Sequence, residues 1–357
     1  MPDRLSAAMI EVLGSIAPGR PLREGLDRIL QANMGALIVV GDGPEVLSIC
    51  SGGFLLDAEF SPPRLSELAK MDGAIILAAD SSRIARANVH LVPNPAIATS
   101  ETGTRHRTAE RVARSLDVPV ITVSEDRSVI SVYRGEEQRP LAPVERLLAR
   151  ANQALETLEG YRDRLDVVTN ALSALEVEDM VTVRDVVTVL QRTETVRRIA
   201  EEVDGYSIEL GTDSRLVRLQ LEEMLAGVEE ERRQILRDYL PRGLAWDVGD
   251  ALGALSQLTT ERLLDLSKVA TVLRIGPEGG DLESALRPYG YRLLSKIPRL
   301  PDHVVHNIVD RYGGLQQVLR ASVEDLDTVE GIEVAGAHFV KEGLARLAET
   351  SILDRLG

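Results

Sequence analysis

The sequence is short of cysteine, of aromatic residues and of net positive charge, and each shortage excludes a class of protein. Its 357 residues include a single cysteine, Cys50, which rules out an internal disulfide and a cysteine-based zinc site. Aromatic residues make up only 3% of the chain, so stacking platforms for single-stranded nucleic acid cannot dominate its surface. The formal net charge of −15 argues against a protein that coats DNA through a general basic surface. Any contact with nucleic acid must therefore be local.

Targeting signals and the common nucleotide motifs are missing as well. The first sixteen residues carry Asp3 and Glu11 inside an apolar pattern, unlike a secretory signal. No uncharged apolar run is long enough to span a bilayer, so we expect a cytoplasmic protein without a membrane partner. No G-x4-GK[ST] string occurs, and Gly41-Asp42-Gly43 lacks the third glycine and the helical pattern of a dinucleotide fingerprint. Any use of ATP must therefore employ a different phosphate cradle.

Apolar runs and amphipathic segments alternate over the first 142 residues. Short apolar runs predict strands at 36–40, 46–49, 74–79, 88–92, 118–123 and 128–133. A period near 3.6 residues predicts helices at 4–16, 22–32, 63–70 and from 107 onward. This mixture predicts an α/β domain built on a mixed sheet over residues 1–142.

From residue 143 the pattern becomes helical, and the length of the chain leaves room for two or three domains. Leucine and alanine at three-, four- and seven-residue spacing predict a long helix with a coiled-coil-like stripe. Further helices are predicted at 183–203, 214–240 and 260–273. We interpret 143–286 as a helical linker or spine and 287–357 as a small α-helical domain.

The stretch Gly103-Thr104-Arg105-His106-Arg107-Thr108-Ala109 collects two arginines, a histidine and two threonines where a helix is predicted to begin. A helix N-terminus leaves backbone N–H groups unpaired and carries a partial positive charge. Arginines there are unfavourable unless an anion compensates them, and guanidinium groups bind phosphate oxygens in pairs. This stretch therefore predicts a polyphosphate site.

A second stretch, Asp72-Gly73-Ala74, lies at the start of a predicted strand. A carboxylate there can hold a hard cation, and a glycine lets a ligand approach the backbone. An Asp-Gly pair is also a common turn, but the presence of 103–109 favours metal and nucleotide binding. The cations that flank His106 oppose its protonation, which favours a hydrogen bond to phosphate or ribose over a role as general base.

Together and in this order, Asp72-Gly73-Ala74 and Gly103-Thr104-Arg105-His106-Arg107 resemble the paired signature of diadenylate cyclases. The C-terminal region narrows the resemblance to the DNA-integrity scanning (DisA) family and extends it over essentially the whole chain. That family joins two ATP molecules into the second messenger cyclic di-AMP, releases two pyrophosphates and assembles as octamers. Because the product is two-fold symmetric, the nucleotide sites formed by these stretches in two chains must face each other.

The resemblance also implies roles for individual residues. Asp72 is expected to hold Mg²⁺ or Mn²⁺ and to help activate the ribose 3′-OH. The catalytic set is then Asp72, Arg105, His106 and Arg107. The nucleotide-binding set is Gly73, Ala74, Leu91, Gly103, Thr104, Arg105, His106, Arg107, Thr108, Ser124 and Arg127.

Residues 287–357 resemble a tandem helix-hairpin-helix module, which contacts DNA phosphates without regard to sequence. The DNA contacts that it implies are Lys296, Arg299 and Gly331. Glu333 stands where the pattern has a glycine, and nine basic against ten acidic residues give this segment a net charge of −1. We therefore expect a modest, strongly salt-dependent affinity for branched DNA, which would couple the enzyme to DNA damage.

One alternative stays open, namely a non-catalytic, nucleotide-responsive protein that binds DNA junctions. The intact Asp72 favours catalysis, because phosphate binding alone would favour a site without a carboxylate.

Overall fold

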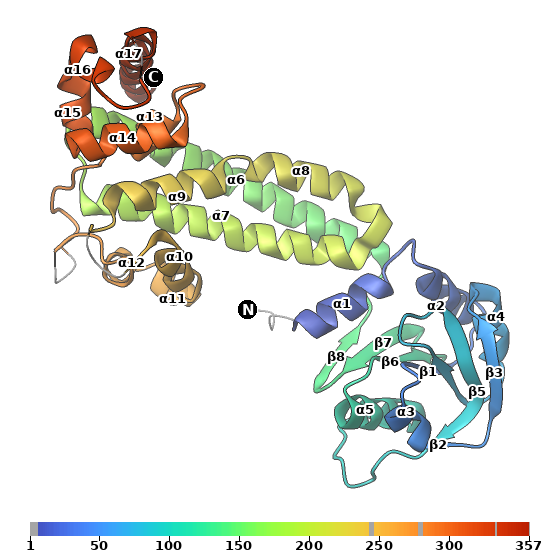
Figure 1. Cartoon of the computed structure of the whole chain (residues 1–357). Coiled ribbons are helices and arrows are strands. Elements are labelled where there is room, and N and C mark those ends of the chain that lie inside the picture. The colour runs from blue at the N-terminus through green and yellow to red at the C-terminus, as the bar shows by residue number, and fades with distance from the viewer. Residues whose placement is uncertain (1–5, 243–245, 278–280, 333, 357) are drawn as a thin grey trace. The chain divides into compact units, whose positions relative to one another are not determined.

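The structure is a computed structural model that describes residues 6–242, 246–277, 281–332 and 334–356 (Figure 1). The chain divides into two compact units, Met1–Gln153 with Val203–Leu219, and Ala154–Glu202 with Gln220–Gly357. The predicted fold class is confirmed, since an α/β part on a mixed sheet is followed by long helices and by a group of C-terminal helices. The three-domain division at residues 142 and 286 stays a prediction. No helix in the described ranges has the length and apolar composition needed to cross a membrane.

An eight-stranded mixed sheet forms the centre of the first unit. Its strands are β1 (Ala36–Val40), β2 (Cys50–Ser51), β3 (Phe54–Glu59), β4 (Ala74–Leu77), β5 (Arg83–Leu91), β6 (Val120–Ser124), β7 (Val129–Arg134) and β8 (Glu137–Pro140). The order is β2-β5-β4-β1-β6-β7-β8, and β3 pairs with β5. β1 and β4 run parallel, whereas the other recorded pairs are antiparallel.

Helices cover both faces of this sheet (Figure 1). They are α1 (Ala7–Ser15), α2 (Pro21–Gln31), α3 (Pro44–Ser48), α4 (Pro62–Leu68) and α5 (Thr104–Leu116). Successive strand residues point to opposite faces, so Ile38 packs with α1, α2 and α4, whereas Val39 packs with α3 and α5. The continuous apolar run of β1 is therefore explained by burial on both sides.

One local prediction in this unit is wrong, and two strands of the sheet were not predicted. Residues 46–49 were expected to form a strand but belong mostly to α3, because Pro44 favours a first helical turn and one turn suffices to bury Val46. β3 and β8 were not predicted. β3 exposes most of its side chains, and β8 is a short polar edge strand, so neither shows the apolar pattern of a buried strand.

The helical region begins with α6 (Val144–Glu178) and α7 (Val183–Leu210), and a 3₁₀ turn (Gly211–Ser214) follows. The next helices are α8 (Arg215–Leu225), α9 (Val228–Tyr239), α10 (Val248–Ser256), α11 (Thr260–Leu263) and α12 (Leu266–Leu273). α7 continues past its predicted end at Asp204-Gly205, because burial of Val203 and Leu210 outweighs the low helix propensity of glycine. The predicted helix 214–240 is divided near Gly227, whose φ is +76°, and the predicted helix 260–273 is divided at Asp265, which caps α12.

The C-terminal helices pack around one core, and two pairs of them are joined as helix–turn–helix hairpins. They are α13 (Tyr291–Ser295), α14 (Asp302–Tyr312), α15 (Leu315–Arg320), α16 (Val323–Asp327) and α17 (Val334–Leu356). The turn between α13 and α14 contains Arg299 with a φ of +61°, and the turn between α16 and α17 contains Gly331 with a φ of +89°.

Candidate active site

The strand order brings the predicted nucleotide residues to one edge of the sheet. β1 and the parallel β4 both begin at this edge, whereas the antiparallel β5 and β6 end there. Continuing the pair Ala74–Val89 by two residues places Asp72 level with Leu91, and continuing the pair Ala36–Val123 by one residue places Gly35 level with Ser124. Segments far apart in the sequence therefore meet where the strands stop, which is where loops carry binding side chains.

The first turn of α5 reaches the same edge and contacts Asp72 directly. Arg105 Nη2 lies 2.6 Å from Asp72 Oδ1, so the two stretches singled out in the sequence do meet. Gly103 caps α5 with a φ of +89°, a conformation that favours glycine. The roles of these residues in catalysis stay predictions.

Gly35 lies against Arg105, a contact that sequence reasoning missed. A Cβ atom at residue 35 would stand 2.1 Å from Arg105 Nη1, so a side chain there would displace the guanidinium. Gly35 lies beyond the end of α2 at Gln31, so termination of that helix does not explain the glycine. The glycine instead makes room for an arginine that arrives from a distant part of the chain.

Asp72 can bind a metal ion only together with a substrate that supplies further coordinating oxygens. Its side chain is 89% exposed, and no group of three or more His, Cys, Asp or Glu in the described ranges could hold a metal ion. Mg²⁺ usually keeps several waters and is bound by one or two carboxylates together with substrate phosphates. A single exposed carboxylate beside arginines fits a cation that arrives with a polyphosphate.

Packing within the unit also explains why Gly73, Ala74 and Leu91 stand at these positions. A Cβ atom on Gly73 would lie 2.5 Å from Asn88 Cα, so β5 itself requires a glycine there. Ala74 and Leu91 are buried in the core on the α5 side of the sheet. Their predicted contacts with a nucleotide remain untested, and burial limits Ala74 and Leu91 mainly to backbone contacts.

His106 is tied to the interior of the unit. Its Nδ1 lies 2.8 Å from the Tyr133 hydroxyl and 3.2 Å from Thr122 Oγ1. Burial lowers the pKa of His106, the carboxylate of Glu101 opposes this effect, and the charges of Arg127 and Arg105 add to it. Burial is thus the main cause of the lowered pKa, and of the two arginines that flank His106 in the sequence only Arg105 is among its causes. Glu101, Thr122 and Tyr133 were not anticipated, because only tertiary packing brings them to the histidine.

The remaining cations and hydroxyls of the site are open to a ligand. Arg107, Thr104 and Arg127 are exposed, and neither arginine forms an ion pair with any residue that the structure describes. Thr108 is half-buried in the first turns of α5. The backbone N–H of Arg127, in the turn between β6 and β7, donates at 3.4 Å to Oγ of Ser124, the last residue of β6.

The buried Glu110 organises the loop that leads into α5. Its carboxylate accepts hydrogen bonds from the Thr99 hydroxyl and from the backbone N–H of Ser100, the latter at 3.1 Å. Burial would raise the pKa of Glu110, but the hydrogen bond from Thr99 and the charge of Arg114 outweigh burial and lower it. The acid stays ionised and holds the loop in place.

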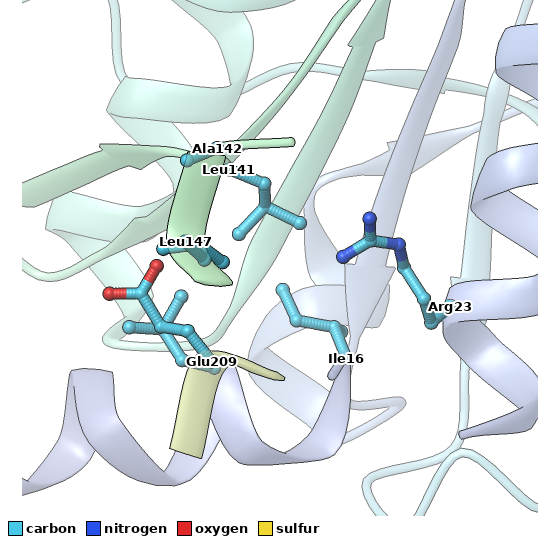
Figure 2. A pocket seen from close by; sticks show the side chains of 7 residues that line it. Ile16, Arg23, Leu141, Ala142, Leu147 and Glu209 are labelled. Atoms are coloured by element: carbon cyan, nitrogen blue, oxygen red, sulfur yellow. The ribbon is translucent and has the colours of Figure 1, made fainter. Parts of the chain in front are cut away.

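Two cavities elsewhere in the chain do not coincide with this site. The first, of about 10 Å³, is near the lower limit for one water molecule (Figure 2). It is lined by Leu13, Ile16, Arg23, Leu141, Ala142, Leu147 and Glu209. The second, of about 220 Å³, lies in the second unit between Arg287 and Arg320. None of the predicted nucleotide residues lines either cavity.

The predicted DNA contacts in the C-terminal hairpins differ in their availability. Arg299 and Gly331 are exposed. The Lys296 side chain is 31% exposed and its Nζ lies 3.5 Å from Glu231, and burial together with the charge of Arg292 lowers its pKa. Glu333 lies outside the described residues. Lys296 is thus already engaged within the protein.

Comparisons with known proteins show which family this chain resembles. A family profile described as DisA bacterial checkpoint controller nucleotide-binding matches residues 23–138, and one described as DisA bacterial checkpoint controller linker region matches 141–280. A DNA integrity scanning protein DisA from Frankia casuarinae is 53% identical over 96% of both chains. The protein of the same name from Acidothermus cellulolyticus is 54% identical over 99% of this chain and 98% of its own.

Among solved structures, DacA from Staphylococcus aureus is 25% identical over 37% of this chain and 88% of that chain, with a TM-score of 0.29.

Proposed function

This chain belongs to the DisA family of DNA integrity scanning proteins, and on that premise we propose that it is a diadenylate cyclase that condenses two ATP molecules into cyclic di-AMP. The observation that carries the proposal is the meeting of Asp72 with Arg105 at the sheet edge, inside the region matched by the nucleotide-binding profile. We further propose that it works in the cytoplasm as a homo-oligomer, by resemblance an octamer.

The reaction is a nucleotidyl transfer that occurs twice. The ribose 3′-oxygen of one ATP bonds to the α-phosphorus of the other, the bond from that phosphorus to the bridging oxygen breaks, and pyrophosphate leaves. The proton of the 3′-OH passes to a base or to water. Such transfers depend mainly on positioning and on neutralisation of charge. Arg105, Arg107 and Arg127 supply positive charge around the phosphates, and Thr104 and Thr108 supply hydroxyl donors.

The ion pair between Asp72 and Arg105 gives the site a resting state. Both side chains are well exposed, and exposed pairs contribute only about 0–1 kcal/mol, so a polyphosphate can displace the carboxylate from the guanidinium. Arg105 then binds phosphate, and the Asp72 carboxylate is released from its ion pair with Arg105. Asp72 would hold Mg²⁺ or Mn²⁺, which would supply positive charge to neutralise the substrate phosphates.

Symmetry of the product requires a second copy of the chain. β3 offers apolar surface beside the site, because Phe54 is 55% exposed and Leu55 is 73% exposed. Phe54 pairs with Ala87 on β5, one residue from the Asn88 that packs against Gly73. We propose that this face, continuous with the site, contributes to the contact that brings two sites together.

The turns of the C-terminal hairpins are the proposed contacts with DNA. The exposed Arg299 and the positive-φ Gly331 favour a contact between the hairpin turns and DNA phosphates. The net charge of −1 over residues 287–357 offers little electrostatic steering. We therefore propose weak binding to branched DNA that salt strongly reduces.

Pyrophosphate release separates the enzyme from the non-catalytic alternative. The wild-type chain is incubated with ATP and Mn²⁺, and pyrophosphate and cyclic di-AMP are quantified together. We expect two pyrophosphates for each cyclic product. ATP binding without release of pyrophosphate would favour a nucleotide-responsive DNA-junction protein and would reject the cyclase.

A further inference from the structure

A hydrogen-bonded chain of three residues runs behind the phosphate site. His106 Nδ1 lies 2.8 Å from the Tyr133 hydroxyl, which lies 3.2 Å from Glu101 Oε1. The Gln138 amide donates to the same Glu101 oxygen and, at 3.3 Å, to the Tyr133 oxygen. The members come from α5, β7, β8 and the loop before α5, so the arrangement exists only in the folded unit.

The direction of each hydrogen bond follows from the chemistry of the groups. An ionised carboxylate only accepts, so the single proton of the Tyr133 hydroxyl is donated to Glu101. Burial and the charge of Glu101 raise the pKa of Tyr133, which keeps the phenol protonated. The Tyr133 oxygen can then only accept from His106, so Nδ1 of the imidazole carries the hydrogen.

We propose that Tyr133 and Glu101 are positioning residues that hold His106 in the Nδ1–H tautomer and leave Nε2 for the nucleotide. No partner for Nε2 is recorded among the residues that the structure describes, whereas Nδ1 contacts both Tyr133 and Thr122. Fixing the tautomer of a histidine through a hydrogen bond at its other nitrogen is a common way of defining its role. The inference rests on the proposed function only in naming ATP as the ligand.

The tautomer determines what His106 can do to a phosphate. In the neutral ring Nε2 carries a lone pair, so it accepts hydrogen bonds and cannot donate one to a phosphate oxygen. If Nε2 takes up a proton when the polyphosphate binds, it becomes a charged donor. Glu101 stabilises that charge through Tyr133, whereas Arg105 and Arg127, the cations that act on the ring, oppose it. Binding of ATP should therefore be linked to uptake of a proton at His106.

The test begins with the ligand-free full chain labelled with ¹⁵N-histidine. Solid-state NMR above the pKa of His106 reports which ring nitrogen is protonated, and His106→Gln assigns the signal among the five histidines. We expect a protonated Nδ1 in the wild type and a growing share of the Nε2–H form in Tyr133→Phe, which keeps the buried ring. Tyr161→Phe, in α6, is the control. An Nε2–H wild type, or a tautomer unaffected by Tyr133→Phe, overturns the proposal.

A pH titration of the same NMR signal tests Glu101 and shows whether each neighbouring charge raises or lowers the pKa of His106. Glu101→Gln removes a favourable charge and should lower the pKa of His106, whereas Arg127→Gln should raise it. In assays, Tyr133→Phe should reduce kcat roughly tenfold, the effect of losing one hydrogen bond, with a smaller change in KM. Shifts of equal sign, or a fall in Tm without a change in tautomer, would mean that the residues are only structural.

The experiments distinguish failure of the tautomer proposal from failure of the cyclase proposal. The tautomer is measured without substrate, so an Nδ1–H ring in a chain that releases no pyrophosphate upholds the positioning and rejects the cyclase. An active cyclase in which His106 is the Nε2–H tautomer upholds the cyclase and rejects the positioning.

Discussion

At the scale of single residues, the candidate site is a set of charges that partly neutralise one another until an anion arrives. Arg105 is paired with Asp72, whereas Arg107 and Arg127 have no carboxylate partner among the described residues. A polyphosphate would find two unpaired cations and a third that is weakly held. This balance explains why two arginines are tolerated at the positive end of α5.

Gly35 provides a test of how Arg105 is placed. Gly35→Ala would put a methyl group 2.1 Å from Arg105 Nη1, so the guanidinium must move away from Asp72. We expect a loss of cyclase activity of roughly tenfold or more with little change in Tm, because a misplaced catalytic group is costly. Gly43→Ala is the matched control, since a Cβ atom there meets nothing within 4 Å. Equal activities of the two variants would contradict the role of Gly35.

Single residues also show where sequence reasoning stops. The pairing of Asp72 with the first turn of α5 could be predicted, because both stretches carry the residue types that phosphate and metal need. Gly35 and Tyr133 could not, because nothing in their local pattern indicates the distant side chain that each contacts. Glycines required by close packing, such as Gly73 beside Asn88, look the same in a sequence as glycines required by a ligand.

At the scale of elements, the first hairpin is anchored to the helical region by a buried ion network. Arg292 of α13 is fully buried and lies 2.5 Å from Glu176 of α6 and 2.5 Å from Glu231 of α9. Asp238 accepts the backbone N–H groups of Gly290, Tyr291 and Arg292. In the sequence Arg292 looks like another basic residue of a DNA-binding module. Its burial could not be foreseen, because its partners come from two other helices.

Removing Arg292 should destabilise the second unit strongly. Arg292→Ala leaves Glu176 buried without its cation, which typically costs about 3–5 kcal/mol. Urea unfolding of the full chain, followed by far-UV circular dichroism, should show a lower midpoint for this variant. Arg299→Ala, at an exposed position, is the control and should leave the midpoint unchanged. A loss below about 1 kcal/mol, the range of an exposed pair, would mean that the network contributes little.

The turn between α13 and α14 gives a prediction for DNA binding. Arg299→Ala should weaken binding to a branched duplex at low salt, because it removes an exposed charge from the α13–α14 turn. Lys296→Ala should have a smaller direct effect, because Lys296 is already paired with Glu231. Gel-shift titrations at several salt concentrations measure both, with unfolding curves as a check on stability. A larger loss for Lys296→Ala in a stably folded variant would reverse this assignment.

Helix boundaries were less predictable than the presence of helices. The long apolar stripe of α6 was evident from its spacing, whereas the end of α7 was placed too early, because packing carries that helix through Gly205. The short apolar run at 46–49 was compatible with either a strand or one helical turn, and Pro44 decided in favour of the turn.

At the scale of the whole molecule, the proposed reaction predicts that two copies of the chain bring their sites together. Leu55→Glu places a charge on the exposed apolar face of β3, so the chain should still fold and bind ATP. We expect it to shift to smaller oligomers and to lose cyclisation. Light scattering coupled to size-exclusion chromatography, with ATP affinity measured by calorimetry, tests this directly. Glu45→Gln, on the exposed surface of α3, is the control. Full activity in a monomeric Leu55→Glu chain would contradict facing sites.

Asp72→Asn tests the central claim most directly. The change is nearly isosteric and removes the charge of a side chain that is 89% exposed, so folding, Tm and oligomeric state should be unchanged. Production of cyclic di-AMP from ATP and Mn²⁺ should fall to background, whereas ATP should still bind to the arginines. The measurement is cyclic di-AMP yield by chromatography, with wild type and Asp72→Asn at equal concentration. Wild-type yield from Asp72→Asn would remove the carboxylate from the mechanism and contradict the site described here.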